Sequence, residues 1–145
     1  DGMALIEMRK FGDFYGAGLW RYLLGVDSGV PWIAHVPKST ETVAAAGDRL
    51  TPAAVKKAEQ RGERIVRQGD WFFVPCRRRP IGETIEQEPL DDDHVADEMV
   101  RGRTTYVRGV VRHSHHQTLI LDGWHKAIRN NAVRTGRLAL GGDAD

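Results

Sequence analysis

Residues 20–36 read WRYLLGVDSGVPWIAHV, and this stretch decides the fold class. Two apolar runs, Trp20–Val26 and Val30–Val36, are joined through Asp27-Ser28-Gly29. Glycine supplies the positive φ that a tight turn needs, so the stretch predicts a β-hairpin. Pro31 stands at the start of the second strand, where a missing N–H group is tolerated.

Other stretches also favour extended structure, some of them because they are rich in β-branched and aromatic residues. Thr104–Arg112 is such a stretch, Met3–Met8 is a short apolar run, and Glu63–Arg67 and Trp71–Val74 predict a second hairpin that turns at Gln68-Gly69-Asp70. One helix is clear, at about residues 52–61, because Thr51 can cap it, Pro52 suits its first position and Gly62 suits its end. Hairpins separated by a helix predict an α+β domain, mainly antiparallel hairpins with one or two short helices.

The remaining segments carry weaker signals. Thr42–Ala46 can form a short helix, and the polar run from Asp91 to His94 can cap another helix over Val95–Val100. We expect Phe11–Gly18 to be a glycine-rich loop and Arg77–Pro89 to be irregular.

The chain has 145 residues, 41% of them hydrophobic and 28% charged, which suits a single domain over residues 1–145. The acidic stretch 83–93 can act as a loop between two lobes, and we expect residues 136–145 to be a frayed tail. The single cysteine, Cys76, excludes an internal disulfide and the multi-cysteine zinc folds. No apolar run approaches the roughly 20 residues that span a bilayer, and no signal peptide is visible. We therefore expect no membrane partner and a cytoplasmic location.

Charge is segregated along the sequence, although the formal net charge is +1. Residues 83–98 carry eight acidic side chains and no basic one, whereas from Met99 to Arg137 eight bases face Asp122 alone. Such a basic segment favours an anionic partner, above all nucleic acid. The acidic stretch can also fold over the basic one and neutralise it.

Four of the six histidines fall within thirteen residues: His113, His115, His116 and His125. Imidazole is a common zinc ligand and a common acid–base group. If Thr118–Leu121 is a strand and Asp122-Gly123 turns into a next strand, His125 lies two strands, ~10 Å, from the first histidines. We therefore predict a divalent metal site, such as zinc, from His113, His115 and a carboxylate of residues 91–98, with Asp93 or alternatively His94 as the third ligand. Histidine acid–base chemistry without a metal remains open.

The basic segment also suits nucleic acid, because seven of its eight bases are arginines. The planar guanidinium binds phosphate with two parallel hydrogen bonds. Arg108 and Arg112 are an even number of residues apart and share a strand face with Tyr106, which can stack on a base. Three more residues complete the predicted interface: Trp124, Lys126 and Arg129.

Three functional classes follow. The first is a small non-enzymatic binding module that contacts a polyanion, above all nucleic acid, through the His/Arg-rich segment 99–137. The second is a metal-dependent hydrolase or nuclease that uses His113 and His115 with a carboxylate from 91–98. The third is a structural or interaction subunit of a viral or mobile-element assembly, with the aromatic segments Phe11–Trp20 and Trp71–Phe73 as interfaces. Whether the chain is an enzyme stays open at this point, because no complete catalytic signature is present.

Overall fold

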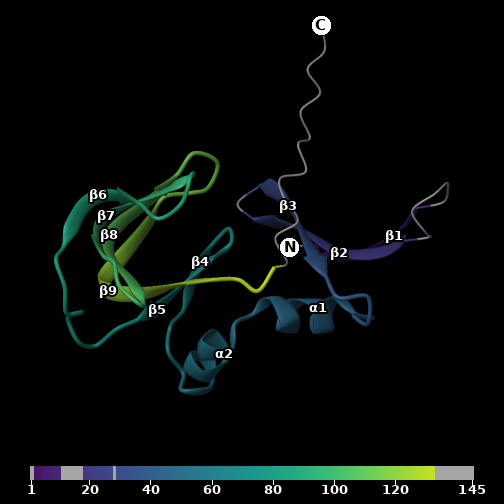
Figure 1. Ribbon diagram of the computed structural model, residues 1–145, viewed down its shortest axis with the longest axis horizontal. Coiled ribbons are helices and arrows are strands. Elements are labelled where there is room, and N and C mark those ends of the chain that lie inside the picture. The colour runs from purple at the N-terminus through teal and green to yellow at the C-terminus, as the bar shows by residue number, and fades with distance from the viewer. Residues whose placement is uncertain (1, 11–17, 28, 133–145) are drawn as a thin grey trace, which may run out of the picture.

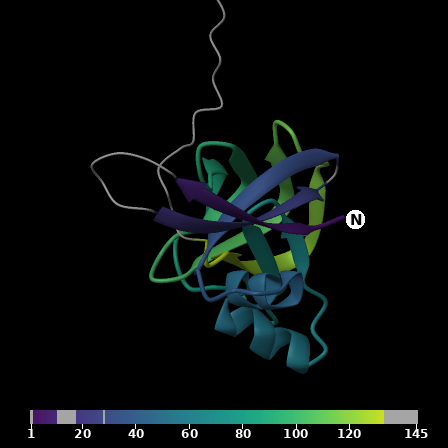
Figure 2. The ribbon, with the colours of Figure 1, turned by 90° about the vertical axis from the view of Figure 1, so that its right-hand side faces the viewer.

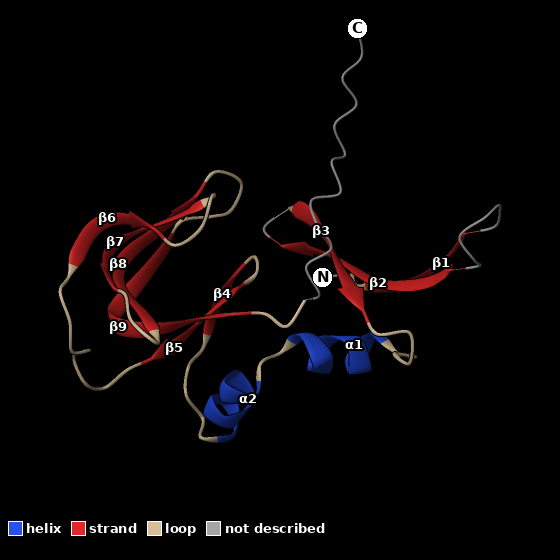
Figure 3. Ribbon diagram, viewed as in Figure 1, coloured by secondary structure: helices blue, strands red, loops and turns tan. Residues whose placement is uncertain are grey.

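The computed structural model describes residues 2–10, 18–27 and 29–132 (Figure 1). Its elements form two antiparallel sheets and two short helices, which confirms the predicted α+β class (Figure 3). Figures 1 and 2 show the sheets as separate layers, with both helices along one side of them. Residues 11–17 of the predicted loop and the predicted tail 136–145 lie outside the described residues.

Sheet A contains the hairpin that the sequence predicts. Its strands, in spatial order, are β1 (Ala4–Lys10), β2 (Gly18–Asp27) and β3 (Val30–Val36). Gly29, in the turn between β2 and β3, has φ 83°, the left-handed conformation that glycine adopts without strain. The sheet buries Leu23 and Val36 against Leu50 of the first helix.

The two helices follow sheet A directly. They are α1 (Val43–Leu50) and α2 (Ala53–Gln60), and α2 confirms the helix expected near residues 52–61. Thr42 caps α1, because its hydroxyl accepts a hydrogen bond from the N–H of Ala45 at 3.1 Å. The predicted cap of α2 is wrong: the hydroxyl of Thr51 donates back to the carbonyl of Gly47 at 2.9 Å, and α2 starts without a side-chain cap.

Sheet B holds six strands in the order β4-β5-β9-β8-β7-β6. The strands are β4 (Val66–Gln68), β5 (Trp71–Pro75), β6 (Ile85–Pro89), β7 (His94–Val100), β8 (Thr105–His113) and β9 (Leu119–Arg129). The predicted hairpin of residues 63–74 appears as β4 and β5, and the predicted strand 104–112 appears as β8. The last strand, β9, pairs with both β5 and β8, so it closes the centre of the sheet.

Three sequence-based expectations about sheet B are wrong. Val95–Val100 is not a helix but most of β7, because it pairs with β6 and β8 and buries Ala96 and Met99 completely. Residues 85–89 form β6 in place of irregular structure. There is no turn at Asp122-Gly123: β9 is continuous, and its ladder with β8 shifts register there, with Gly123 at φ 84°.

The core of sheet B is formed by large apolar side chains with no exposed surface, among them Phe73, Met99, Val107 and Val111. A separate cluster packs α2 against the other face of β5 through Phe72. Phe72 and Phe73 of the predicted aromatic interface are therefore buried inside the protein.

Candidate functional site

A cavity of about 200 Å³ lies between the two sheets. Sheet A contributes Pro31 and Trp32 of β3 to its wall. Besides Gly69, sheet B and its turns contribute charged and imidazole groups from distant parts of the sequence: Arg67, Asp70, Asp91, Asp93, His94, His113, His116 and Arg129. The fold thus collects ionisable residues in a single hollow.

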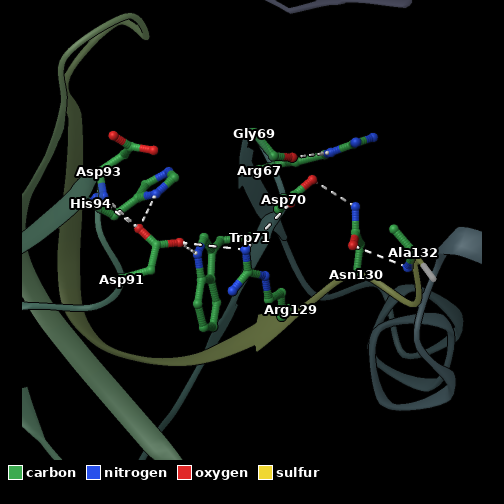
Figure 4. Close-up of polar contacts among 10 residues, drawn as sticks. All are labelled: Arg67, Gly69, Asp70, Trp71, Asp91, Asp93, His94, Arg129, Asn130 and Ala132. Atoms are coloured by element: carbon green, nitrogen blue, oxygen red, sulfur yellow. Dashed lines mark hydrogen bonds and ion pairs between the residues drawn. The ribbon is translucent and has the colours of Figure 1, made fainter. Parts of the chain in front are cut away.

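The most tightly held of these groups is His94, at the start of β7 (Figure 4). Oδ1 of Asp91 accepts the backbone N–H of His94 at 2.8 Å and lies 2.9 Å from Nδ1 of the same residue's ring. This oxygen also accepts the N–H of Asp93 at 3.1 Å. An aspartate that binds N–H groups two and three residues later stabilises a tight turn. The local sequence therefore fixes both the turn before β7 and the position of the imidazole.

The second oxygen of Asp91 is also engaged. Nε1 of Trp71 donates to Oδ2 at 2.7 Å, and Nη2 of Arg129 lies 4.0 Å from it. Burial by itself would raise the pKa of Asp91. The hydrogen bonds from the His94 ring, the Trp71 indole and two backbone N–H groups outweigh burial and hold this pKa well below its ordinary value. Because an ionised carboxylate accepts but cannot donate, the proton of a neutral His94 ring lies on Nδ1.

Nε2 is then the basic nitrogen of His94. The residue is 4% exposed, and Nε2 is buried with no hydrogen-bond partner among the described residues. A buried acceptor without a partner costs about 1–3 kcal/mol, so it requires an explanation. An imidazole held by a carboxylate on one nitrogen, with a lone pair on the other, is the arrangement of a general base and also of a metal-bound histidine.

Two further imidazoles lie beside His94. His113 is paired with it across β7 and β8, with the ring centroids 4.3 Å apart. His116, in the turn after β8, has its ring 4.4 Å from that of His113 and 6.5 Å from that of His94. Burial, followed by the proximity of His94 and His116, lowers the pKa of His113, which is therefore neutral near pH 7. Its Nδ1 accepts the backbone N–H of His115 at 3.0 Å, so the ring proton of neutral His113 lies on Nε2.

This proton position bears on the predicted metal site. A metal ligand must offer a lone pair, and His113 already uses that of Nδ1 and carries a proton on Nε2. In the part of the chain that the structure describes, no group of three His, Cys, Asp or Glu side chains is arranged to hold a metal ion. His113 and Asp93 of the predicted set do line one cavity, but His115 is exposed and is not among the lining residues.

His125 lies apart from the histidine cluster, as expected, but for a different reason. It is buried in β9 opposite Val107 and Pro75, and its Nδ1 is 3.1 Å from the carbonyl oxygen of Gly123. Val107 lies six residues before His113 on β8, which corresponds to about 20 Å along a strand.

Two guanidinium groups line the cavity. Arg67 lies 5.5 Å from the ring centroid of Trp32, and its Nε donates to the carbonyl oxygen of Gly69 at 3.0 Å. Arg129 lies 5.5 Å from the ring centroid of Trp71 and 3.6 Å from Oδ2 of Asp70. Figure 4 shows Arg67, Asp70 and Arg129 together with Asn130, whose Nδ2 donates to Oδ1 of Asp70 at 2.9 Å.

The structure brings some, but not all, of the six residues of the predicted nucleic-acid interface together. Arg108 forms an ion pair with Glu98 and lies 5.0 Å from the ring centroid of Trp124. Nη1 of Arg112 is 2.6 Å from Oδ1 of Asp97. Tyr106 and Lys126 are paired across β8 and β9, two residues along these strands from Arg108 and Trp124, whereas Arg129 lines the cavity. Asp97 and Glu98, in the acidic run 83–98, thus neutralise part of the basic segment. This is one of the arrangements that the charge segregation predicts.

Sequence reasoning considered His94 as an alternative ligand and missed the roles of Asp91 and His116. The available signal was the spacing of Asp91 and His94, an aspartate three residues before a histidine at the start of a strand. From the sequence alone, that spacing predicts a helix cap. The acidic stretch 83–93 contributes β6 to the sheet and this turn to the cavity.

No family model, curated protein or solved structure matches this chain. Among the described residues, no helix has the length and apolar character needed to cross a membrane.

Proposed function

We propose that the chain is a metal-independent hydrolase of phosphate esters, with the cavity at His94 as its active site. The observation that carries this proposal is Nε2 of His94, which is buried and has no partner among the described residues, while ionised Asp91 holds the other ring nitrogen. An imidazole in this environment is suited to accept a proton from a nucleophile.

In the proposed reaction, Nε2 of His94 takes a proton from water as the water oxygen forms a bond to phosphorus. The bond between phosphorus and the ester oxygen then breaks. The proton passes from Nε2 to that oxygen, which leaves as an alcohol, and His94 is neutral again. Asp91 keeps the ring oriented and stabilises the transient imidazolium.

Phosphate is proposed as the reacting group because of Arg67 and His113. Arg67 lines the cavity and makes no ion pair with any carboxylate that the structure describes. Neutral His113 has an N–H group that can donate to a phosphoryl oxygen without adding a charge. Asp70 opposes an anionic substrate less than its charge suggests, because Asn130 and Arg129 both contact it.

The metal-dependent form of this function is less favoured, since the proton on Nε2 of His113 occupies the position that an ion would need. The role as a subunit of a larger assembly stays a prediction.

Hydrolysis of bis(4-nitrophenyl) phosphate in the presence of EDTA tests the proposal. We expect His94→Ala to lower kcat by at least about 100-fold, the usual contribution of a general base. Asp91→Asn should lower kcat through loss of ring orientation. His115→Ala is the matched control, because it removes a neighbouring imidazole but keeps the backbone N–H that binds His113.

Two results would refute the proposal. One is the release of 4-nitrophenol at the same rate by the wild type and the His94→Ala variant. The other is a reaction that EDTA abolishes and zinc restores, which would favour the metal-dependent class.

A further inference from the structure

We infer that a second surface, about 25 Å along β8 from the histidine cluster, binds single-stranded nucleic acid. It is a trough of about 530 Å³ where the loop after β5 meets the β7–β8 hairpin, and we name it the arginine trough. Its wall includes four arginines: Arg78, Arg79, Arg101 and Arg103. No acidic side chain is among its lining residues in the described part of the chain.

The trough continues into a neighbouring hollow of about 420 Å³, with which it shares Cys76, Arg78 and Tyr106. The second hollow adds Lys126 and one acid, Glu63, whose carboxylate is already 2.7 Å from Nε of Arg61. The continuous surface is therefore strongly basic, in contrast to the net charge of the whole chain.

The charges in the trough are less compensated than those of the predicted interface. Arg78, Arg79 and Arg103 make no ion pair with any described carboxylate, and all three are exposed. Arg101 alone of the four has a carboxylate nearby, with its Nε 3.4 Å from Oε1 of Glu88. Unpaired guanidinium groups on a concave surface attract a phosphate chain, because each phosphate that binds releases counterions.

Sheet register provides an aromatic platform beside these charges. Tyr106 of β8 is opposite Lys126 of β9, which is opposite Val74 of β5. Directly paired residues of antiparallel strands project from the same face, so the phenol and the ammonium group lie side by side. Tyr106 is half-buried and lines both hollows. A ring beside cationic groups suits an unpaired base and its phosphate, which favours a single strand over a duplex.

Binding is tested with a fluorescein-labelled twelve-residue oligothymidylate and fluorescence anisotropy. If three or four phosphates are contacted, log K should fall with log[salt] with a slope of about −2 to −3. The triple variant Arg78→Ala/Arg79→Ala/Arg103→Ala should weaken binding at least about tenfold and flatten that slope. Tyr106→Leu should weaken binding at least about fivefold with the slope unchanged, because stacking carries no charge.

The matched control is the double variant Arg108→Ala/Arg112→Ala, which removes two arginines that are already paired with Glu98 and Asp97. It should bind the oligonucleotide within about twofold of the wild type, since these charges are internally neutralised. His94→Ala should also bind normally, so this inference and the proposed hydrolase activity fail or succeed separately.

Cys76 provides a second measurement, because it is the single cysteine of the chain and lies in the trough wall. Saturating oligonucleotide should slow its alkylation by N-ethylmaleimide in the wild type and in the double variant. The inference is overturned if no oligonucleotide binds at about 20 mM salt, where charge screening is weak. It is also overturned if the triple and double variants lose binding equally. A third contrary result is displacement of the labelled oligonucleotide by poly-glutamate as effectively as by unlabelled oligonucleotide.

Discussion

One carboxylate oxygen, Oδ1 of Asp91, binds both the backbone and the imidazole of His94, at 2.8 Å and 2.9 Å. The same contact that shapes the turn before β7 therefore orients the catalytic ring of the proposed site. A change at Asp91 should affect the stability of the fold and the chemistry of the cavity together.

Asp91→Asn should lower the free energy of unfolding by about 2 kcal/mol at pH 7, the scale of hydrogen bonds to a charged group. The pKa of Asp91 is lowered in the folded state, so its ionised form contributes stability above the unfolded pKa of about 3.9. That contribution is lost as the pH falls further. Urea denaturation at several pH values should show the two proteins converging toward pH 2; a gap that stays constant would contradict the assignment.

The pKa of His113 is lowered by burial, whereas hydrogen bonds lower that of Asp91. Both shifts make the folded protein less stable as the pH falls. Burial and neighbouring imidazoles disfavour its protonated form in the folded protein. Its stabilising effect is therefore complete above the unfolded pKa of about 6.5 and is lost as the pH falls below it. Between pH 7.5 and pH 5, Tm should fall less in His113→Gln than in the wild type, while exposed His115→Gln serves as the control.

Gly25 should not tolerate a side chain. A Cβ atom there would lie 2.4 Å from Cζ2 of Trp32, so the indole that lines the cavity and contacts Arg67 would have to move. We expect Gly25→Ala to cost about 1–3 kcal/mol in thermal unfolding, as overpacking does. Gly47→Ala is the control, since no atom lies within 4 Å of its added Cβ and alanine favours helix α1 by about 0.5–1 kcal/mol. Equal effects at both positions would count against a packing origin.

The ion pair between Glu98 and Arg108 should contribute little to stability. Their side chains are 30% and 44% exposed, and solvent screens such pairs. A double-mutant cycle with alanine at both positions should give a coupling energy below about 1 kcal/mol. This energy should decrease further in about 0.5 M salt, where the Debye length is only a few ångströms. A larger, salt-independent coupling would indicate that the paired charges hold β7 and β8 together.

Local sequence signals predicted the β2–β3 hairpin and α2 well, because Gly29 and Gly62 both adopt positive φ where the sequence demanded a turn or a helix end. They failed at β7. Val95–Val100 has no strong local preference, and its strand structure depends on hydrogen bonds to β6 and β8 that a local pattern does not contain. Asp122-Gly123 resembles a turn, but pairing with two neighbouring strands keeps β9 extended.

The same limit applied to the site. Histidine spacing pointed to His113, whereas His94 lies beside it because β7 and β8 pair in this register. Charge segregation was interpreted as a surface for an anion, but β7 and β8 are neighbours in the sheet and their opposite charges pair. The arginine trough forms where two loops that are distant in the sequence come together, and residue spacing along the chain does not predict that contact.

The central position of β9 also has a kinetic consequence. During translation, β5 and β8 each keep one unpaired edge until β9 has left the ribosome, and the residues that pair between β5 and β9 are 50 to 58 positions apart in the sequence. Long-range pairing of this kind is slow and leaves strand edges open to other nascent chains. Sheet B therefore closes late, because the strand that fills its centre is the last one to be made.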